Sequence, residues 1–69
     1  RLKHARRILN WAIVFANLQS YKQAISDVSI AISINEEAAF AYLLRAKCLQ
    51  IDGNPSEAFA DLQTFIGKQ

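Results

Sequence analysis

The stretch that decides the fold is ILNWAIVFANLQSYKQAISDVSIA (residues 8–31), because its pattern of small and large apolar positions returns 34 residues later as YLLRAKCLQIDGNPSEAFADLQTF (residues 42–65). A fixed period of this length is typical of stacked-repeat proteins in which each repeat is one helix–turn–helix unit. The coinciding pairs are Ile8 and Tyr42, Ala12 and Ala46, Phe15 and Leu49, Ala24 and Ala58, and Val28 and Leu62.

Helical periodicity extends along the whole chain. Apolar residues recur at intervals of three and four rather than two, so nothing in the sequence indicates strands. We predict an all-α fold of four helices, over residues 2–18, 21–33, 36–51 and 55–67. The short turns between them force neighbouring helices to run antiparallel. The predicted inner faces carry Ile8, Trp11, Ala12, Phe15 and Ala16 in the first helix, Ala24, Ile25, Val28, Ala31 and Ile32 in the second, and Ala58, Phe59, Leu62, Phe65 and Ile66 in the last.

Turn and capping residues separate these helices. Ser20 with Gln23 predicts a capping box at the start of the second helix. Asn35, followed by two glutamates, predicts the start of the third helix. Gly53 is expected in the left-handed conformation that ends a helix, and Asn54 before a proline is expected to cap the fourth helix.

A chain of 69 residues makes one small domain, which the period divides into repeat one at about residues 5–38 and repeat two at about residues 39–69. Hydrophobic residues make up 52% of the chain and charged residues only 20%. That composition is apolar for a chain with so much surface relative to its volume. We therefore expect either a part of a longer array or a unit that associates with itself.

Positive charge gathers at the start of the chain, where Arg1, Lys3, Arg6 and Arg7 lie within seven residues. The remaining residues carry four Lys and Arg against six Asp and Glu. The basic segment is either a solvated helix face or a site for phosphates or acidic peptides. Nucleic-acid binding through this segment and Trp11 is the less favoured function, because the rest of the chain is mildly acidic.

The sequence carries no pattern of enzyme chemistry, cofactor or metal. His4 has no neighbouring ligand or carboxylate, and Cys48 lies on an apolar stripe, where we expect a buried and inert thiol. A single cysteine excludes an intramolecular disulfide and favours a reducing, intracellular and cytoplasmic setting. Polar residues interrupt every apolar run, so no membrane span is expected, and the start of the sequence lacks a signal-peptide pattern.

The chain resembles the tetratricopeptide repeat (TPR) family. In repeat one the matching residues are Ile8, Trp11, Ala12, Phe15, Tyr21, Ala24, Val28 and Ala31. In repeat two they are Tyr42, Ala46, Gly53, Ala58 and Leu62, and Leu49 stands where an aromatic residue is usual. The small residues Ala12, Ala24, Ala46 and Ala58 are expected where helix backbones approach closely. Arg45, Pro55 and Phe65 depart from the family pattern, which more often has leucine, an aromatic residue and alanine at these places.

The resemblance implies a TPR-like superhelix of antiparallel helices in which the first helix of each repeat lines a concave groove. Such grooves bind an extended peptide or a helix of a partner protein, so the expected role is that of a scaffold or adaptor. The alternative is that the same residues pack on a neighbouring repeat or on another copy of the chain. The groove residues that the resemblance implies are Arg6, Leu9, Asn10, Ile13, Asn17, Phe40, Leu43, Leu44, Lys47 and Ile51.

One branch of the family, found in co-chaperones, binds acidic C-termini through a clamp of Lys, Asn and Arg. Asn10 matches one asparagine of that clamp. Phe40 and Leu44 occupy the places where basic partners are expected in the following repeat. Clamp-type binding is therefore not expected of these two repeats alone.

Overall fold

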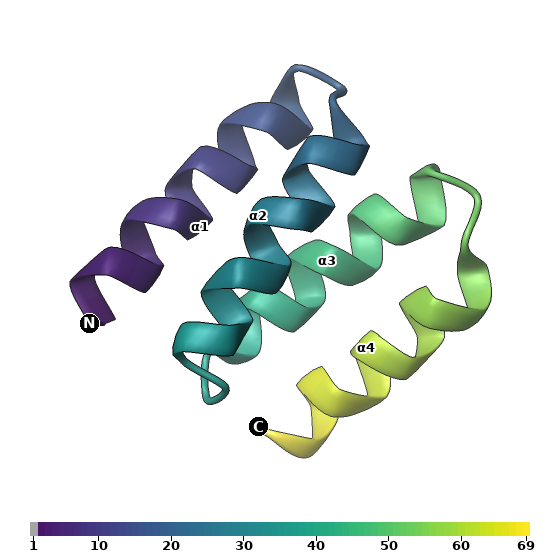
Figure 1. Cartoon of the computed structure of the whole chain (residues 1–69). Coiled ribbons are helices and arrows are strands. Elements are labelled where there is room, and N and C mark those ends of the chain that lie inside the picture. The colour runs from purple at the N-terminus through teal and green to yellow at the C-terminus, as the bar shows by residue number, and fades with distance from the viewer. Residues whose placement is uncertain (1) are drawn as a thin grey trace.

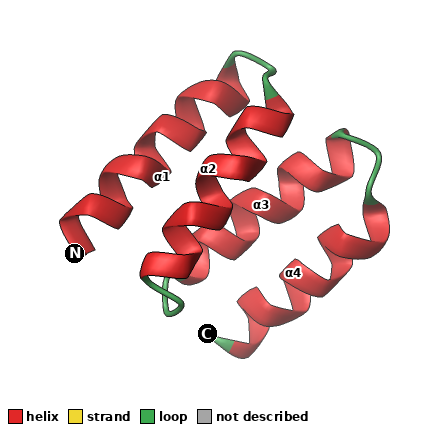
Figure 2. Ribbon diagram, in the orientation of Figure 1, coloured by secondary structure: helices red, strands yellow, loops and turns green. Residues whose placement is uncertain are grey.

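The computed structural model describes residues 2–69, which form four α-helices joined by three short turns (Figures 1 and 2). No strand occurs among these residues, which confirms the all-α prediction. Arg1, one of the four basic residues at the start of the sequence, lies outside the described residues. The helices are α1 (Leu2–Asn17), α2 (Tyr21–Ile34), α3 (Ala39–Ile51) and α4 (Pro55–Gly67).

The helices lie next to one another in chain order, and each runs opposite to the one before (Figure 1). α2 packs against both α1 and α3, and α3 packs against both α2 and α4, with a smaller contact between α1 and α3. The Cα trace measures 31 × 29 × 15 Å, so the molecule is a slab. None of the described helices is long and apolar enough to pass through a bilayer.

Two clusters of buried side chains hold the helices together. The predicted contact alanines Ala12 and Ala24 are fully buried in the first cluster, whereas Ala46 and Ala58, 2% and 3% exposed, belong to the second. Ile25 packs against both clusters and so connects them. The first cluster also contains Val28, Ile32, Ala41, Leu44 and Cys48, and the second contains Leu49.

The two hairpin turns have the same backbone geometry, 34 residues apart. Gln19 and Gly53 take left-handed φ values of 65° and 89°. The Ser20 N–H donates to the Phe15 carbonyl at 2.8 Å, and the Asn54 N–H donates to the Leu49 carbonyl at the same distance. These bonds complete a Schellman motif at the end of α1 and again at the end of α3.

The predicted capping box at the start of α2 is wrong. Ser20 is the N-cap residue, but its side chain makes no capping hydrogen bond, and neither does that of Asn54 at the start of α4. The Gln23 amide donates instead to the Asp27 carboxylate, one turn further along, at 3.5 Å. The Gln23 side chain therefore bonds to a residue four positions ahead on the same face of α2 and not back to the helix start.

The third helix begins at Ala39, three residues later than predicted. Asn35 ends α2 instead of starting α3, since its N–H donates to the Ala31 carbonyl at 2.9 Å. Its side-chain Oδ1 accepts a hydrogen bond from the Glu37 N–H at 3.2 Å. An asparagine that bonds the backbone two residues ahead stabilises a turn, and this turn competes with the helix start that the sequence indicates.

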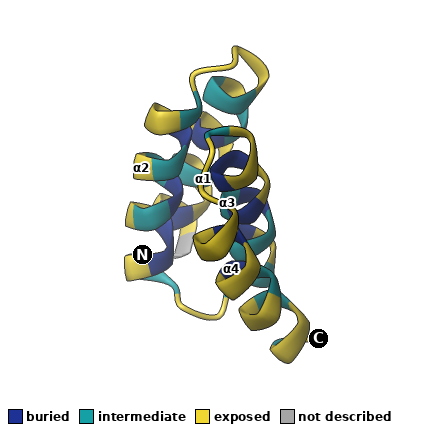
Figure 3. Ribbon diagram, turned by 90° about the vertical axis from the view of Figure 1, so that its right-hand side faces the viewer, coloured by how far each residue is buried: buried dark blue, intermediate teal, exposed yellow. Residues whose placement is uncertain are grey.

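Three large residues assigned to inner faces are exposed instead. Trp11, Phe59 and Ile66 are 56%, 61% and 66% exposed. They lie on α1 and α4, the two edge helices, and α4, which faces the viewer in Figure 3, is exposed along most of its length. The periodicity of a helix indicates its apolar arc, but a neighbouring helix must be present to cover the whole arc.

Candidate functional site

The candidate surface runs along α1 and α3, the two helices that the resemblance to the TPR family implies as the lining of a groove. On α1, Arg6, Asn10 and Asn17 are exposed, whereas Leu9 and Ile13 are half-buried against the first cluster. Arg6, Leu9, Ile13 and Asn17 follow one another at steps of three, four and four, which keeps them on one helix face. This α1 stripe has an apolar middle between polar ends.

A second stripe lies on α3 at the same steps. Phe40 and Ile51 are 49% and 61% exposed near the two ends of the helix, with half-buried Leu43 and exposed Lys47 between them. Each residue of this α3 stripe stands 34 positions after its counterpart on α1. The prediction that Leu44 lines the groove is wrong, because this residue is only 9% exposed and belongs to the first cluster. It is one turn away from Phe40 but faces α2 and α1 across the core.

An open pocket of about 250 Å³ adjoins the α1 stripe. Its apolar lining comes from α1, α2 and the turn that joins α2 to α3, and Arg6 and Asn35 supply its polar groups. A guanidinium and a carboxamide beside an apolar hollow suit an apolar side chain that carries or adjoins a carboxylate. The remaining lining residues are Ala5, Leu9, Ala31 and Ala38.

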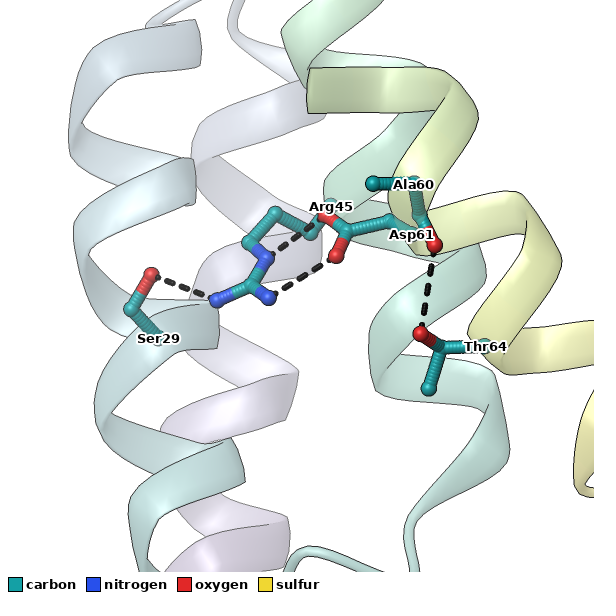
Figure 4. Close-up of polar contacts among 5 residues, drawn as sticks. All are labelled: Ser29, Arg45, Ala60, Asp61 and Thr64. Atoms are coloured by element: carbon teal, nitrogen blue, oxygen red, sulfur yellow. Dashed lines mark hydrogen bonds and ion pairs between the residues drawn. The ribbon is translucent and has the colours of Figure 1, made fainter. Parts of the chain in front are cut away.

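A polar network joins α2, α3 and α4 (Figure 4). The Arg45 guanidinium donates from Nε to Asp61 Oδ2 at 2.7 Å and from Nη2 to Asp61 Oδ1 at 2.9 Å. Its Nη1 donates to Ser29 Oγ at 3.1 Å. Hydrogen bonding to Asp61 raises the pKa of Arg45, and Asp61 itself is only 7% exposed.

The resemblance to the TPR family does not predict this network, because it marks Arg45 only as a departure from the leucine of the family pattern. The sequence nevertheless contains a usable signal. Arg45 precedes Gly53 by eight residues and Asp61 follows it by eight, so the two face each other across an antiparallel hairpin. The network borders an open pocket of about 380 Å³. Since Asp61 and Ser29 already engage the guanidinium, we assign this pocket no ligand.

The side chains that could act as nucleophiles, bases or metal ligands do not gather at one site in the described residues. Cys48 is 1% exposed, as expected of a buried thiol, and burial raises its pKa and so disfavours the reactive thiolate. His4 is exposed. Within residues 2–69, no three His, Cys, Asp or Glu side chains are grouped so as to hold a metal ion.

Trp11 lies beside the basic segment rather than in the core. It borders an open hollow of about 270 Å³ with Arg7, Asn10 and Val14, and its ring centroid is 6.3 Å from that of Phe15.

No protein-family model, curated protein or solved structure matches this chain.

Proposed function

We propose that this chain is a protein-interaction module of the TPR type, which binds a peptide or an amphipathic helix of a partner along α1 and α3. The observation that carries the proposal is the α3 stripe. Phe40 and Ile51 are large apolar residues, and their side chains are about half exposed or more. Phe40 and Ile51 share one helix face with half-buried Leu43 and exposed Lys47, and apolar surface gathered on one face marks an interface more often than apolar residues scattered singly.

The chemistry of the two stripes describes the partner. Leu9 and Ile13 on α1 and Leu43 on α3 are the half-buried apolar residues of the two stripes, while Arg6 and Lys47 supply positive charge. An amphipathic helix laid against such a surface uses apolar anchors one turn apart. We therefore expect the partner to carry apolar anchors with Asp or Glu beside them. Such a role as adaptor or scaffold fits an intracellular setting, which the single cysteine favours.

A peptide library displayed on phage, selected against the whole chain, tests the proposal. A selected peptide should bind the double variant Phe40→Ala/Ile51→Ala at least about tenfold more weakly, since buried anchors contribute most of the affinity at interfaces. Phe59→Ala/Ile66→Ala removes equally exposed apolar residues from α4 and is the matched control. Circular dichroism should show unchanged helix content in both variants.

Two outcomes contradict the proposal. One is that selection yields no peptide whose binding depends on α3. The other is that the selected peptides lose affinity with the α4 control variant and keep it with the α3 variant. Enrichment of peptides with neither apolar anchors nor acidic residues would reject the description of the partner.

A further inference from the structure

The packing of α3 on α2 is a model for a contact between two chains. Val28 and Ile32 of α2 are buried in the first cluster with Ala41, Leu44 and Cys48 of α3. Arg45, on the same side of α3, reaches Ser29 of α2. The junction therefore has two different faces, an aliphatic stripe on α2 and a mixed stripe on α3.

The outer face of α4 carries the counterpart of the α2 stripe. Both hairpin turns share their hydrogen bonds at a spacing of 34, so residues of α4 can be matched to residues of α2 at that spacing. Phe59, Leu62 and Ile66 correspond in this way to Ile25, Val28 and Ile32. Val28 and Ile32 are 0% and 9% exposed beneath α3, whereas Phe59 and Ile66 are 61% and 66% exposed. No described helix follows α4 to cover them.

The outer face of α1 carries the counterpart of the α3 stripe. Arg7, Asn10, Trp11 and Val14 correspond to Ala41, Leu44, Arg45 and Cys48. These α1 residues line a single open hollow, in which Trp11 is 56% and Val14 is 42% exposed. The described part of the chain has no helix that packs on this side of α1.

We propose that a second copy of this chain packs its α1 against α4 of the first, which repeats between chains the packing of α3 on α2 within each chain. A second copy is the occupant because one chain carries both faces of the junction. Trp11 of one copy takes the place that Arg45 takes within the chain. There it meets Phe59 and Gln63, the counterparts of Ile25 and Ser29.

The two faces differ, so the contact is head-to-tail. A head-to-tail contact leaves one free face of each kind at the ends and adds further copies unless the rotation closes a ring. One helix-on-helix contact is small, so association is expected only at roughly 0.1–1 mM protein. This contact uses no residue of the α1 stripe or of the α3 stripe and shares Asn10 with the candidate surface, so the substitutions that test it leave both stripes unchanged.

Sedimentation equilibrium over a concentration series tests the proposal. The mean mass of the wild-type chain should rise with concentration and pass the mass of a dimer. Phe59→Gln/Ile66→Gln, which alters the α4 face, and Trp11→Gln/Val14→Gln, which alters the α1 face, should each stay monomeric. All four side chains are exposed, so the helix content measured by circular dichroism should not change. Phe40→Gln/Ile51→Gln is the control and should associate like the wild type.

Mixing the two monomeric variants makes the test specific for a head-to-tail contact. Each variant has one intact face, so an equimolar mixture should form a dimer and stop there. Three results would overturn the proposal. The first is a wild-type chain that stays monomeric throughout the concentration series. The second is an equimolar mixture of the two variants that stays monomeric. The third is a variant, altered on either face, that still associates on its own.

Discussion

Gln19 holds the left-handed backbone conformation that Gly53 holds in the second turn, with φ values of 65° and 89°. A residue with a β-carbon is strained in this region by about 1 kcal/mol relative to glycine. Gln19→Gly should therefore raise the free energy of unfolding by up to about 1 kcal/mol, and Gly53→Ala should lower it by about the same amount. A β-carbon at Gly53 would meet nothing within 4 Å, so backbone strain alone is measured there.

Urea unfolding followed by circular dichroism measures both changes. Ser26→Gly, within α2 and exposed, is the control and should be destabilising, because glycine weakens a helix interior. A Gln19→Gly variant less stable than the wild type would contradict the assigned role of this turn.

The buried thiol of Cys48 makes the free energy of unfolding depend on pH in the alkaline range. Burial raises the pKa of its thiol, so the folded chain keeps the proton above the pH at which the unfolded chain loses it. The contribution of the protonated thiol is complete below a pH of about 8.5 and decreases above it. The free energy of unfolding should therefore fall more steeply with rising pH in the wild type than in Cys48→Ala. Parallel pH profiles from urea unfolding would contradict this expectation.

At the scale of the helices, one guanidinium links three of them. Arg45 on α3 bonds both oxygens of Asp61 on α4 and the hydroxyl of Ser29 on α2. Asp61→Ala leaves a partly buried guanidinium with one neutral partner and should destabilise the fold by about 1.5–3 kcal/mol. Ser29→Ala removes a single hydrogen bond and should cost about 0.5–1.5 kcal/mol.

A surface ion pair provides the matched comparison. The Lys22 Nζ atom lies 3.0 Å from Asp52 Oδ2, but the Lys22 side chain is 87% exposed. Exposed pairs contribute little, so Lys22→Ala should leave the melting temperature nearly unchanged. If Asp61→Ala were as harmless as Lys22→Ala, the network would not stabilise the packing of α3 and α4.

At the scale of the whole molecule, stability should be highest in the middle. α2 and α3 each pack on both sides, whereas α1 and α4 are edge helices. A helix that packs on one side only has fewer contacts to break, so edge elements open more readily. Amide hydrogen exchange measured by NMR should be slowest at Val28 in α2 and Cys48 in α3 and faster in α4. Equal protection in all four helices would indicate one cooperative unit with no weak edge.

The spacing of apolar residues was sufficient to predict four helices, and Gly53 itself was sufficient to predict the left-handed turn. Both are local properties, because helical periodicity and the φ preference of glycine depend on residues near in sequence. The predicted start of α3 was wrong, although its cause is also local. Asn35 forms a turn that competes with the capping of α3. Choosing between two local hydrogen-bonding patterns requires knowing where α2 has to end against its neighbours.

The tertiary structure alone decided which parts of each apolar arc are covered. Trp11, Phe59 and Ile66 have the same helical periodicity as the buried residues, yet they are exposed because no helix packs on them. Leu44 lies one turn from exposed Phe40 and is buried because α3 turns that side toward α1 and α2. The sequence by itself determined the four helices and the left-handed turn at Gly53, since these arise from neighbouring residues. Burial, the Arg45 network and the exposed stripes depend on contacts between distant helices, which only the folded chain brings together.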